Sequence, residues 1–192
     1  MRTSLARPAP EVAPDLLGGI VTSTIGGSRV SVVITEVEAY TPDDPASHSY
    51  RGMTRANASM FAGPGVLYVY RSYGIHWCTN VVVGQIGEGA AVLLRAGVLI
   101  DGHEIAVDRR GRTDHICDGP GRLAQALGVA GEHDGVDLLG DDSPVRLEPG
   151  TRLPYRTAPR IGISRAVDLE WRWLATVPVV STTPVPESHD HD

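Results

Sequence analysis

Apolar and polar residues alternate most clearly over residues 30–40, and this alternation predicts a strand. Successive side chains of a strand point to opposite faces, so the run divides into two sets. One predicted face holds Val33, Thr35, Val37 and Ala39, and the other holds Ile34, Glu36, Glu38 and Tyr40. The second face therefore carries two carboxylates beside an aromatic ring.

Shorter β-rich runs separated by glycine-containing turns follow, which favours antiparallel pairing. The predicted strands cover residues 66–73, 77–83, 90–96, 145–147 and 160–163. Helical segments are expected at 56–61, inside the long connection 41–64, and at 122–127, which Gly128 ends. The pattern predicts one α+β domain, with a curved, mainly antiparallel sheet as an open-barrel-like core and short flanking helices.

The ends of the chain differ in composition from its centre. Residues 1–14 are expected to be a flexible lead, because Pro8, Pro10 and Pro14 interrupt any helix. The folded domain is expected over residues 15–175. The acidic stretch 176–192, rich in Pro and Thr at its start, is expected to be disordered. A length of 192 residues suits a single domain.

The formal net charge of −6 opposes binding to a polyanion, yet the charge is unevenly placed. Residues 48–80 contain no Asp or Glu but include Arg51, Arg55 and Arg71. The 17 basic residues are all arginine, which excludes Schiff-base chemistry on a lysine side chain. No metal-like cysteine spacing and no apolar run of membrane length occur, so we expect no metal, no cofactor, no membrane association and a cytoplasmic location.

Five of the six tyrosines lie between positions 40 and 73, around a segment that contains the candidate carboxylate Glu38. A buried carboxylate among aromatic faces can hold a flat base and cleave next to it. The Tyr73-Gly74 pair predicts a tight turn with an outward tyrosine, which suits insertion between bases. Arg95 ends an apolar run and needs an acidic partner if it is buried; Glu38 is a candidate.

Other interpretations of these residues stay open at this point. Glu36 and Glu38, at i and i+2 of a strand, lie about 7 Å apart, a spacing that also suits an inverting sugar or nucleoside hydrolase. The two glutamates can instead form a solvated strand face, and the tyrosines can belong to the core. A module that binds distorted DNA without cutting it is a third possibility.

Several stretches, in order over roughly residues 10–174, resemble the alkyladenine DNA glycosylase family, the animal-type 3-methyladenine DNA glycosylases that bacteria also carry. The matching stretches are Thr35-Glu36-Val37-Glu38-Ala39-Tyr40, Ala46-Ser47-His48-Ser49, Met60-Phe61, Pro64-Gly65-Val66-Leu67-Tyr68-Val69-Tyr70, Tyr73-Gly74, Cys78-Thr79-Asn80, Val92-Leu93-Leu94-Arg95-Ala96, Gly119-Pro120-Gly121-Arg122-Leu123 and Pro159-Arg160-Ile161-Gly162-Ile163. The loop between Tyr40 and His48 is one residue shorter than in the animal relatives.

The resemblance implies a monofunctional enzyme that flips alkylated or deaminated purines out of duplex DNA and excises them, initiating base excision repair. It implies that Glu38 activates the water that attacks C1′, and that Arg95 and a backbone carbonyl near Ile163 help to hold this water. Tyr40 would form one wall of the base pocket, His48 and Tyr70 the other.

The resemblance also implies that the bulk of Asn80 opposes the exocyclic amine of normal guanine and that Tyr73 fills the gap left by the flipped nucleotide. The remaining expected DNA contacts are Ile75, where a methionine is common, Arg51, Arg55, Arg71, Gly121 and Arg122. The expected partner is duplex DNA containing damaged purines, bound by a monomer that is associated with the nucleoid in a bacterium.

Overall fold

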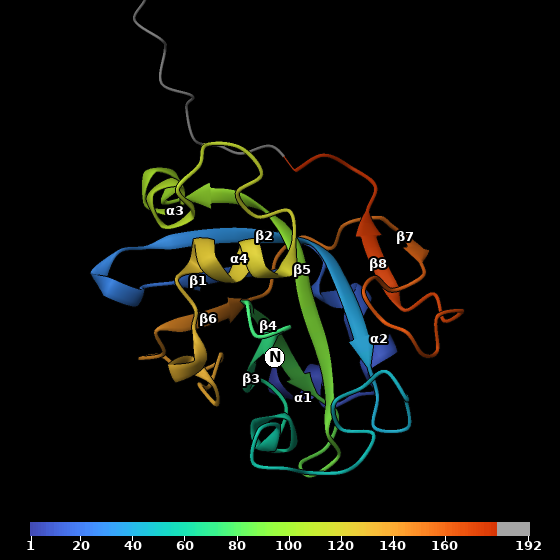
Figure 1. Ribbon diagram of the computed structural model, residues 1–192. Helices are drawn as coiled ribbons and strands as arrows, with labels where there is room; N and C mark the ends of the chain where they lie inside the picture. The colour runs from blue at the N-terminus through green and yellow to red at the C-terminus, as the bar shows by residue number, and fades with distance from the viewer. Residues whose placement is uncertain (180–192) are drawn as a thin grey trace, which may run out of the picture.

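The computed structural model describes residues 1–179. In chain order the elements are α1 (Arg2–Leu5), α2 (Ala9–Leu16), β1 (Ile20–Ser23), η1 (Ile25–Gly27), β2 (Val30–Tyr40), η2 (Ala58–Phe61), β3 (Leu67–Ser72), β4 (His76–Val83), β5 (Ala90–Asp101), α3 (His103–Arg110), α4 (Pro120–Leu127), η3 (Gly131–His133), β6 (Val145–Glu148), β7 (Tyr155–Ala158) and β8 (Arg172–Ala175). The strands form one curled antiparallel sheet with short helices around it, as the sequence predicts (Figure 1).

The long strand β2 organises this sheet. The main path is β3-β4-β5-β2-β1-β6, and β8 pairs with both β2 and β7. On its side opposite β5, β2 pairs first with β1, over residues 30–33, and then with β8, over residues 36–38. The strand that carries Glu38 is therefore held on both edges where the carboxylate lies.

The two faces of the sheet have different roles. On the core face, apolar side chains such as Val37, Leu67 and Val81 pack with α2 and α4 in one buried cluster. On the other face, Tyr68 and Val82 form a smaller cluster with Met60, Tyr40 and Tyr70. We call this second face the cleft face, because a cleft opens on it. Alternation along β3, along β4 and over residues 90–95 of β5 keeps the two sets of side chains apart.

The alternation along β2 is interrupted once. The register with β5 shifts between Ile34 and Val37, as in a β-bulge. As a result Ile34 and Val37, three positions apart, both lie in the core. Glu36, Glu38 and Tyr40 share a face as predicted, but placing Ile34 with them was wrong, because the bulge changes the phase of the strand.

The prediction of a flexible lead over residues 1–14 is also wrong. Residues 2–5 and 9–16 are helical, with Pro14 inside α2. Leu5, Val12 and Ala13 are buried against the sheet. Burial of this apolar face outweighs the helix-breaking tendency of the prolines, and Pro at the start of a helix costs little.

Smaller differences occur elsewhere in the chain. The expected strand at 160–163 is a loop, and the strands there are β7 and β8. Helix α3 and strand β1 were not predicted, and β5 continues to Asp101, so Arg95 lies inside it. Of the expected tail, residues 180–192 lie outside the described residues. Within residues 1–179, no helix is long and apolar enough to cross a membrane.

Candidate active site

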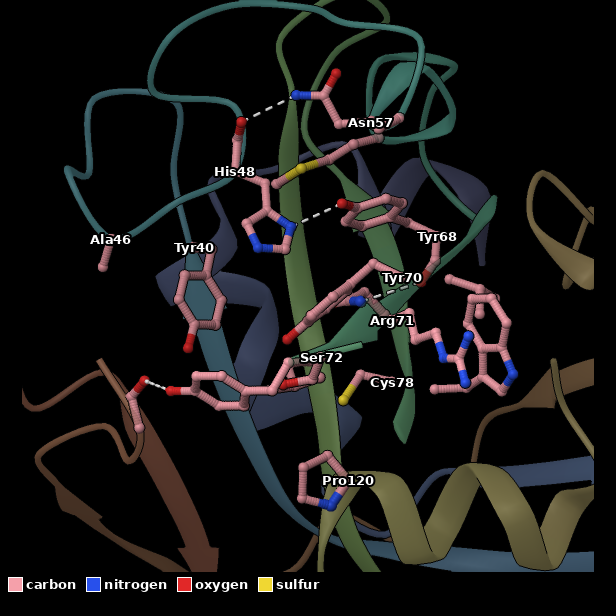
Figure 2. Close-up of a pocket in the computed structure, with 18 of the residues that line it drawn as sticks. Tyr40, Ala46, His48, Asn57, Tyr68, Tyr70, Arg71, Ser72, Cys78 and Pro120 are labelled. Carbon is pink, nitrogen blue, oxygen red and sulfur yellow. Dashed lines mark hydrogen bonds between the residues drawn. The ribbon is translucent and has the colours of Figure 1, made fainter. Parts of the chain in front are cut away.

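A cleft of about 880 Å³ opens on the cleft face of the sheet. Its floor comes from neighbouring strands, which supply Tyr70, Cys78, Asn80 and Arg95. Its sides come from the loop 41–57 and from the loop that follows β7 (Figure 2). Pockets of this volume can bury a ligand the size of a nucleotide.

Glu38 is buried beside this cleft, with 0% of its surface exposed. Its Oε1 accepts a hydrogen bond from the Ile161 backbone amide at 2.8 Å. Its Oε2 accepts one from the Tyr40 hydroxyl at 2.9 Å and lies 3.2 Å from Arg95 Nη1. Each oxygen is thus held by a fixed donor, and the carboxylate is oriented as well as buried.

Arg95 connects the two glutamates that the sequence singled out. Its Nε donates to Glu36 Oε1 at 2.9 Å, and the same oxygen accepts from Arg172 Nη1 at 3.0 Å. Two carboxylates and two guanidinium groups therefore form a charge-balanced network. Although burial acts to lower it, the Glu38 and Glu36 carboxylates raise the pKa of Arg95, which stays cationic.

Aromatic rings face one another across the cleft. The rings of His48 and Tyr70 meet edge to face with their centroids 4.4 Å apart. His48 Nδ1 is hydrogen-bonded to the Tyr68 hydroxyl at 2.7 Å, and Tyr40 stands opposite (Figure 2). Partial burial lowers the pKa of His48, and burial together with the Glu38 charge raises that of Tyr40. Both rings are therefore neutral at pH 7.

The loop 41–57 is tied down by polar side chains. Buried Asn57 donates to the carbonyl oxygens of His48 and Gly52 and accepts from the Thr54 amide. Asp44 pairs with Arg160, and both side chains are fully buried. These bonds fix the segment that presents His48 to the cleft.

The β3–β4 turn projects from the rim of the cleft. Tyr73 and Gly74 have φ values of 49° and 68°, both in the left-handed region. They lie in the three-residue connection between the paired residues Ser72 and His76, where the Ile75 amide donates to the Ser72 carbonyl at 2.9 Å. Tyr73 is 85% exposed and Ile75 66% exposed. Behind them, the Arg71 guanidinium lies 5.6 Å from the centre of the Trp77 ring. The outward tyrosine predicted from Tyr73-Gly74 is confirmed.

Comparison with known proteins identifies the family of this chain. Residues 3–177 match the family model for methylpurine-DNA glycosylase. A Rhodopseudomonas palustris (strain BisB18) protein, provisionally named a 3-methyladenine DNA glycosylase, is 51% identical over 90% of this chain and 84% of its own length. A similarly named protein of Mycobacterium tuberculosis (strain ATCC 25618 / H37Rv) is 47% identical over 83% of each chain.

This chain belongs to the methylpurine-DNA glycosylase family. The resemblance noted in the sequence is therefore confirmed, and the chain is an N-glycosyl hydrolase that acts on DNA. A buried, oriented carboxylate beside an aromatic cleft is chemically suited to this class of enzyme.

The fold of the glycosylase brings most of the expected site residues together. Lining the cleft are Tyr40, His48, Tyr70, Arg71, Tyr73, Asn80, Arg95 and Ile163, with Glu38 directly behind. Asn80 is buried and donates to the Tyr68 carbonyl at 3.0 Å. The Ile161 amide bonds to Glu38, and Ile163, near which a backbone carbonyl was expected to help hold the water, lies in the cleft lining. The individual roles of these residues stay predictions.

Of the expected basic contacts, Arg71 lines the cleft, whereas Arg51, Arg55 and Arg122 lie outside its lining. Arg51 and Arg55 are exposed on the loop 41–57. Gly121 lies in the first turn of α4, where a Cβ would come within 2.8 Å of His76. Arg122 is paired with Asp118 at 2.8 Å. Arg51 and Arg55 are thus exposed on the loop that forms one side of the cleft.

Sequence reasoning missed several residues that shape the site of the glycosylase. Tyr68 was considered only as one of the clustered tyrosines, and Arg160, Asn57, Asp44 and Arg172 were not considered as site residues. An arginine between apolar residues in Pro159-Arg160-Ile161 was the available signal for Arg160. Within residues 1–179, no group of three or more His, Cys, Asp or Glu side chains is placed to hold a metal ion.

Proposed function

We propose that this glycosylase extrudes an alkylated or deaminated purine nucleotide from duplex DNA into the cleft and hydrolyses its N-glycosyl bond, with Glu38 as the general base. The observation that carries the proposal is the Glu38 carboxylate, which is fully buried, held at both oxygens and adjacent to the aromatic cleft. A carboxylate so held can take a proton from a water molecule that attacks C1′ of the sugar.

The surroundings of Glu38 suit this chemistry. Its Oε2 is shared with Tyr40 and Arg95, so a water molecule on the cleft side can meet both the carboxylate and the Arg95 guanidinium. Without lysine side chains, water is the available nucleophile, and the product is an intact abasic site. Such a base contributes about 10²- to 10⁴-fold to the rate.

The aromatic walls provide the recognition of the base. A methylated purine carries positive charge, and stacking between Tyr40 on one side and His48 with Tyr70 on the other gains a cation–π contribution of roughly 0.5–2 kcal/mol. Asn80 on the floor opposes the exocyclic amine of guanine by its bulk. Tyr73 fills the space in the duplex, because extrusion of a base costs a few kcal/mol of stacking and pairing.

The first test is Glu38→Gln, assayed by single-turnover base release from duplexes with one methylated or deaminated purine. The variant keeps the shape of the side chain but cannot accept the proton, so we expect excision to fall at least about 100-fold. Binding to the damaged duplex should remain measurable by fluorescence anisotropy. Full activity of the variant would show that Glu38 is not the base.

A matched control is Glu148→Gln on β6, where the carboxylate is half exposed and paired with Arg146. This change should leave base release unchanged. Tight binding without base release by the unaltered protein would favour the alternative of a non-cleaving module.

The sugar-hydrolase alternative has less support. It needs Glu36 as a second, free carboxylate, but Glu36 Oε1 is occupied by both Arg95 and Arg172. Turnover of free nucleosides without preference for duplex DNA would favour this alternative over the glycosylase. We propose further that the enzyme acts as a cytoplasmic monomer that needs no cofactor.

A further inference from the structure

Arg160 lies directly behind one wall of the cleft. Its guanidinium carbon is 4.7 Å from the centre of the Tyr40 ring and 5.4 Å from that of Trp171. The side chain is fully buried and does not line the cleft, whereas Tyr40 does. Arg160 therefore contacts Tyr40 from the side away from the cleft.

The charge of Arg160 is paired on one side only. Asp44 accepts hydrogen bonds from Nη1 and Nη2, the latter at 3.1 Å, and the Ala39 carbonyl accepts a further one from Nη1 at 3.0 Å. Within residues 1–179, Arg160 Nε has no hydrogen-bond partner. The guanidinium thus contacts both its counter-ion, Asp44, and the Tyr40 ring.

The ring responds to this cation. Although burial and the Glu38 carboxylate raise the pKa of Tyr40, the charge of Arg160 acts in the opposite direction. Together with the 4.7 Å contact, this makes the guanidinium a source of positive charge on the buried side of the ring.

We propose that Arg160 is a specificity-determining residue, which reduces the preference of the Tyr40 wall for cationic bases and thereby admits neutral purines. The inference rests on the proposed function. A π-system attracts a cation through the negative potential of its face. When one face already holds a cation, a second cation on the opposite face is attracted less, while stacking of a neutral base is little affected.

Two substitutions test this inference because they change the charge in opposite senses. Arg160→Gln removes the cation and leaves the Asp44 carboxylate, whereas the isosteric Asp44→Asn leaves the cation without its counter-ion. The measured quantity is the ratio of single-turnover excision rates for 7-methylguanine, which is cationic as a nucleoside in DNA, and hypoxanthine, which is neutral. Because 7-methylguanine and hypoxanthine differ in how readily they leave the sugar, the ratio is compared between variants, and this intrinsic difference cancels.

We expect the ratio to rise about threefold in Arg160→Gln and to fall about threefold in Asp44→Asn. Arg160→Lys, which keeps a cation, should show a ratio closer to that of the unaltered protein even where both rates decrease. Loss of packing alone lowers both rates and cannot move the ratio in opposite directions. Circular dichroism confirms that each variant is folded.

Ratios that stay constant, or that move in the same direction in both single variants, would overturn the inference and leave Arg160 a purely structural residue. If Arg160→Gln does not fold, the sign of the change in Asp44→Asn decides alone, and a rise or no change overturns the inference. No release of either base by the unaltered protein would instead overturn the proposed function, and with it this inference.

Discussion

Burial of the Glu38 carboxylate is unfavourable in free energy. Removing a charged side chain completely from water costs several kcal/mol, which its partners must offset. Arg95, Tyr40 and the Ile161 amide do so, and Glu36 and Arg172 extend the network until its charges balance. A charge held by fixed donors reorganises little during a reaction, so the same contacts that offset the cost of burial also suit the proposed role of Glu38 in proton transfer.

His48 makes the stability of this enzyme pH-dependent at the residue scale. Burial lowers its pKa in the folded state below the ordinary value of 6.5. Below about pH 6.5 the unfolded chain binds a proton that the folded chain does not, so this contribution to stability is lost as the pH falls. We therefore expect the Tm to drop between pH 7 and pH 5, and to drop less in His48→Gln.

Thermal unfolding of both proteins at each pH checks this prediction. The other histidines are common to the two proteins, so their contribution cancels in the comparison. An equal fall in Tm for His48→Gln would show that His48 does not cause this pH dependence of stability.

Among the elements, the hairpin β3–β4 carries core and cleft residues in its strands and an exposed tyrosine in its turn. Its strands place Tyr68, Tyr70, Cys78 and Asn80 on the cleft face and apolar residues in the core. The turn adds nothing to that packing, because Tyr73 is almost fully exposed. The hairpin therefore carries an exposed aromatic side chain that the core does not need and whose hydroxyl donates to the Gly162 carbonyl at 3.4 Å.

Tyr73→Ala should consequently change the free energy of unfolding by less than about 0.5 kcal/mol, as for other exposed positions. Excision from duplex DNA should nevertheless fall on the order of tenfold, because nothing then fills the gap left by the extruded nucleotide. The same lesion in a single strand leaves no such gap, so excision there should change much less. Equal losses on both substrates would show that Tyr73 acts in another way.

For the whole molecule, charge distribution matters more than total charge. A net charge of −6 repels DNA, but residues 48–80 carry arginine without any acidic residue and surround the cleft. Binding should therefore depend on a few phosphate contacts and weaken steeply with salt.

Arg51→Gln or Arg71→Gln should each lower the slope of log K against log salt by about one and weaken binding to all sequences alike. Arg29→Gln is the control: this residue precedes β2 at the end opposite Tyr40 and is paired with Asp101. Titration of labelled duplex at several salt concentrations measures the slopes. An unchanged slope in the Arg51 and Arg71 variants would place the DNA path elsewhere.

Local sequence was sufficient to predict the features that depend on neighbouring residues. The bounds of β2, the αL glycine that ends α4 and the outward turn at Tyr73-Gly74 follow from local alternation and backbone preference. The pairing of Arg95 with Glu38 was also predictable, because a buried guanidinium needs an acid and few acids were near.

Contacts between distant segments could not be predicted in this way, because they depend on how the whole chain folds. The helices α1 and α2 form because the sheet buries their apolar side, and residues 160–163 leave the strand pattern because the Ile161 amide bonds to Glu38. Arg160 and Asp44 are 116 positions apart, and the residues around each of them do not indicate the other as its partner. Alternation and turn chemistry act over a few residues, whereas a buried charge takes whichever partner the folded chain brings to it.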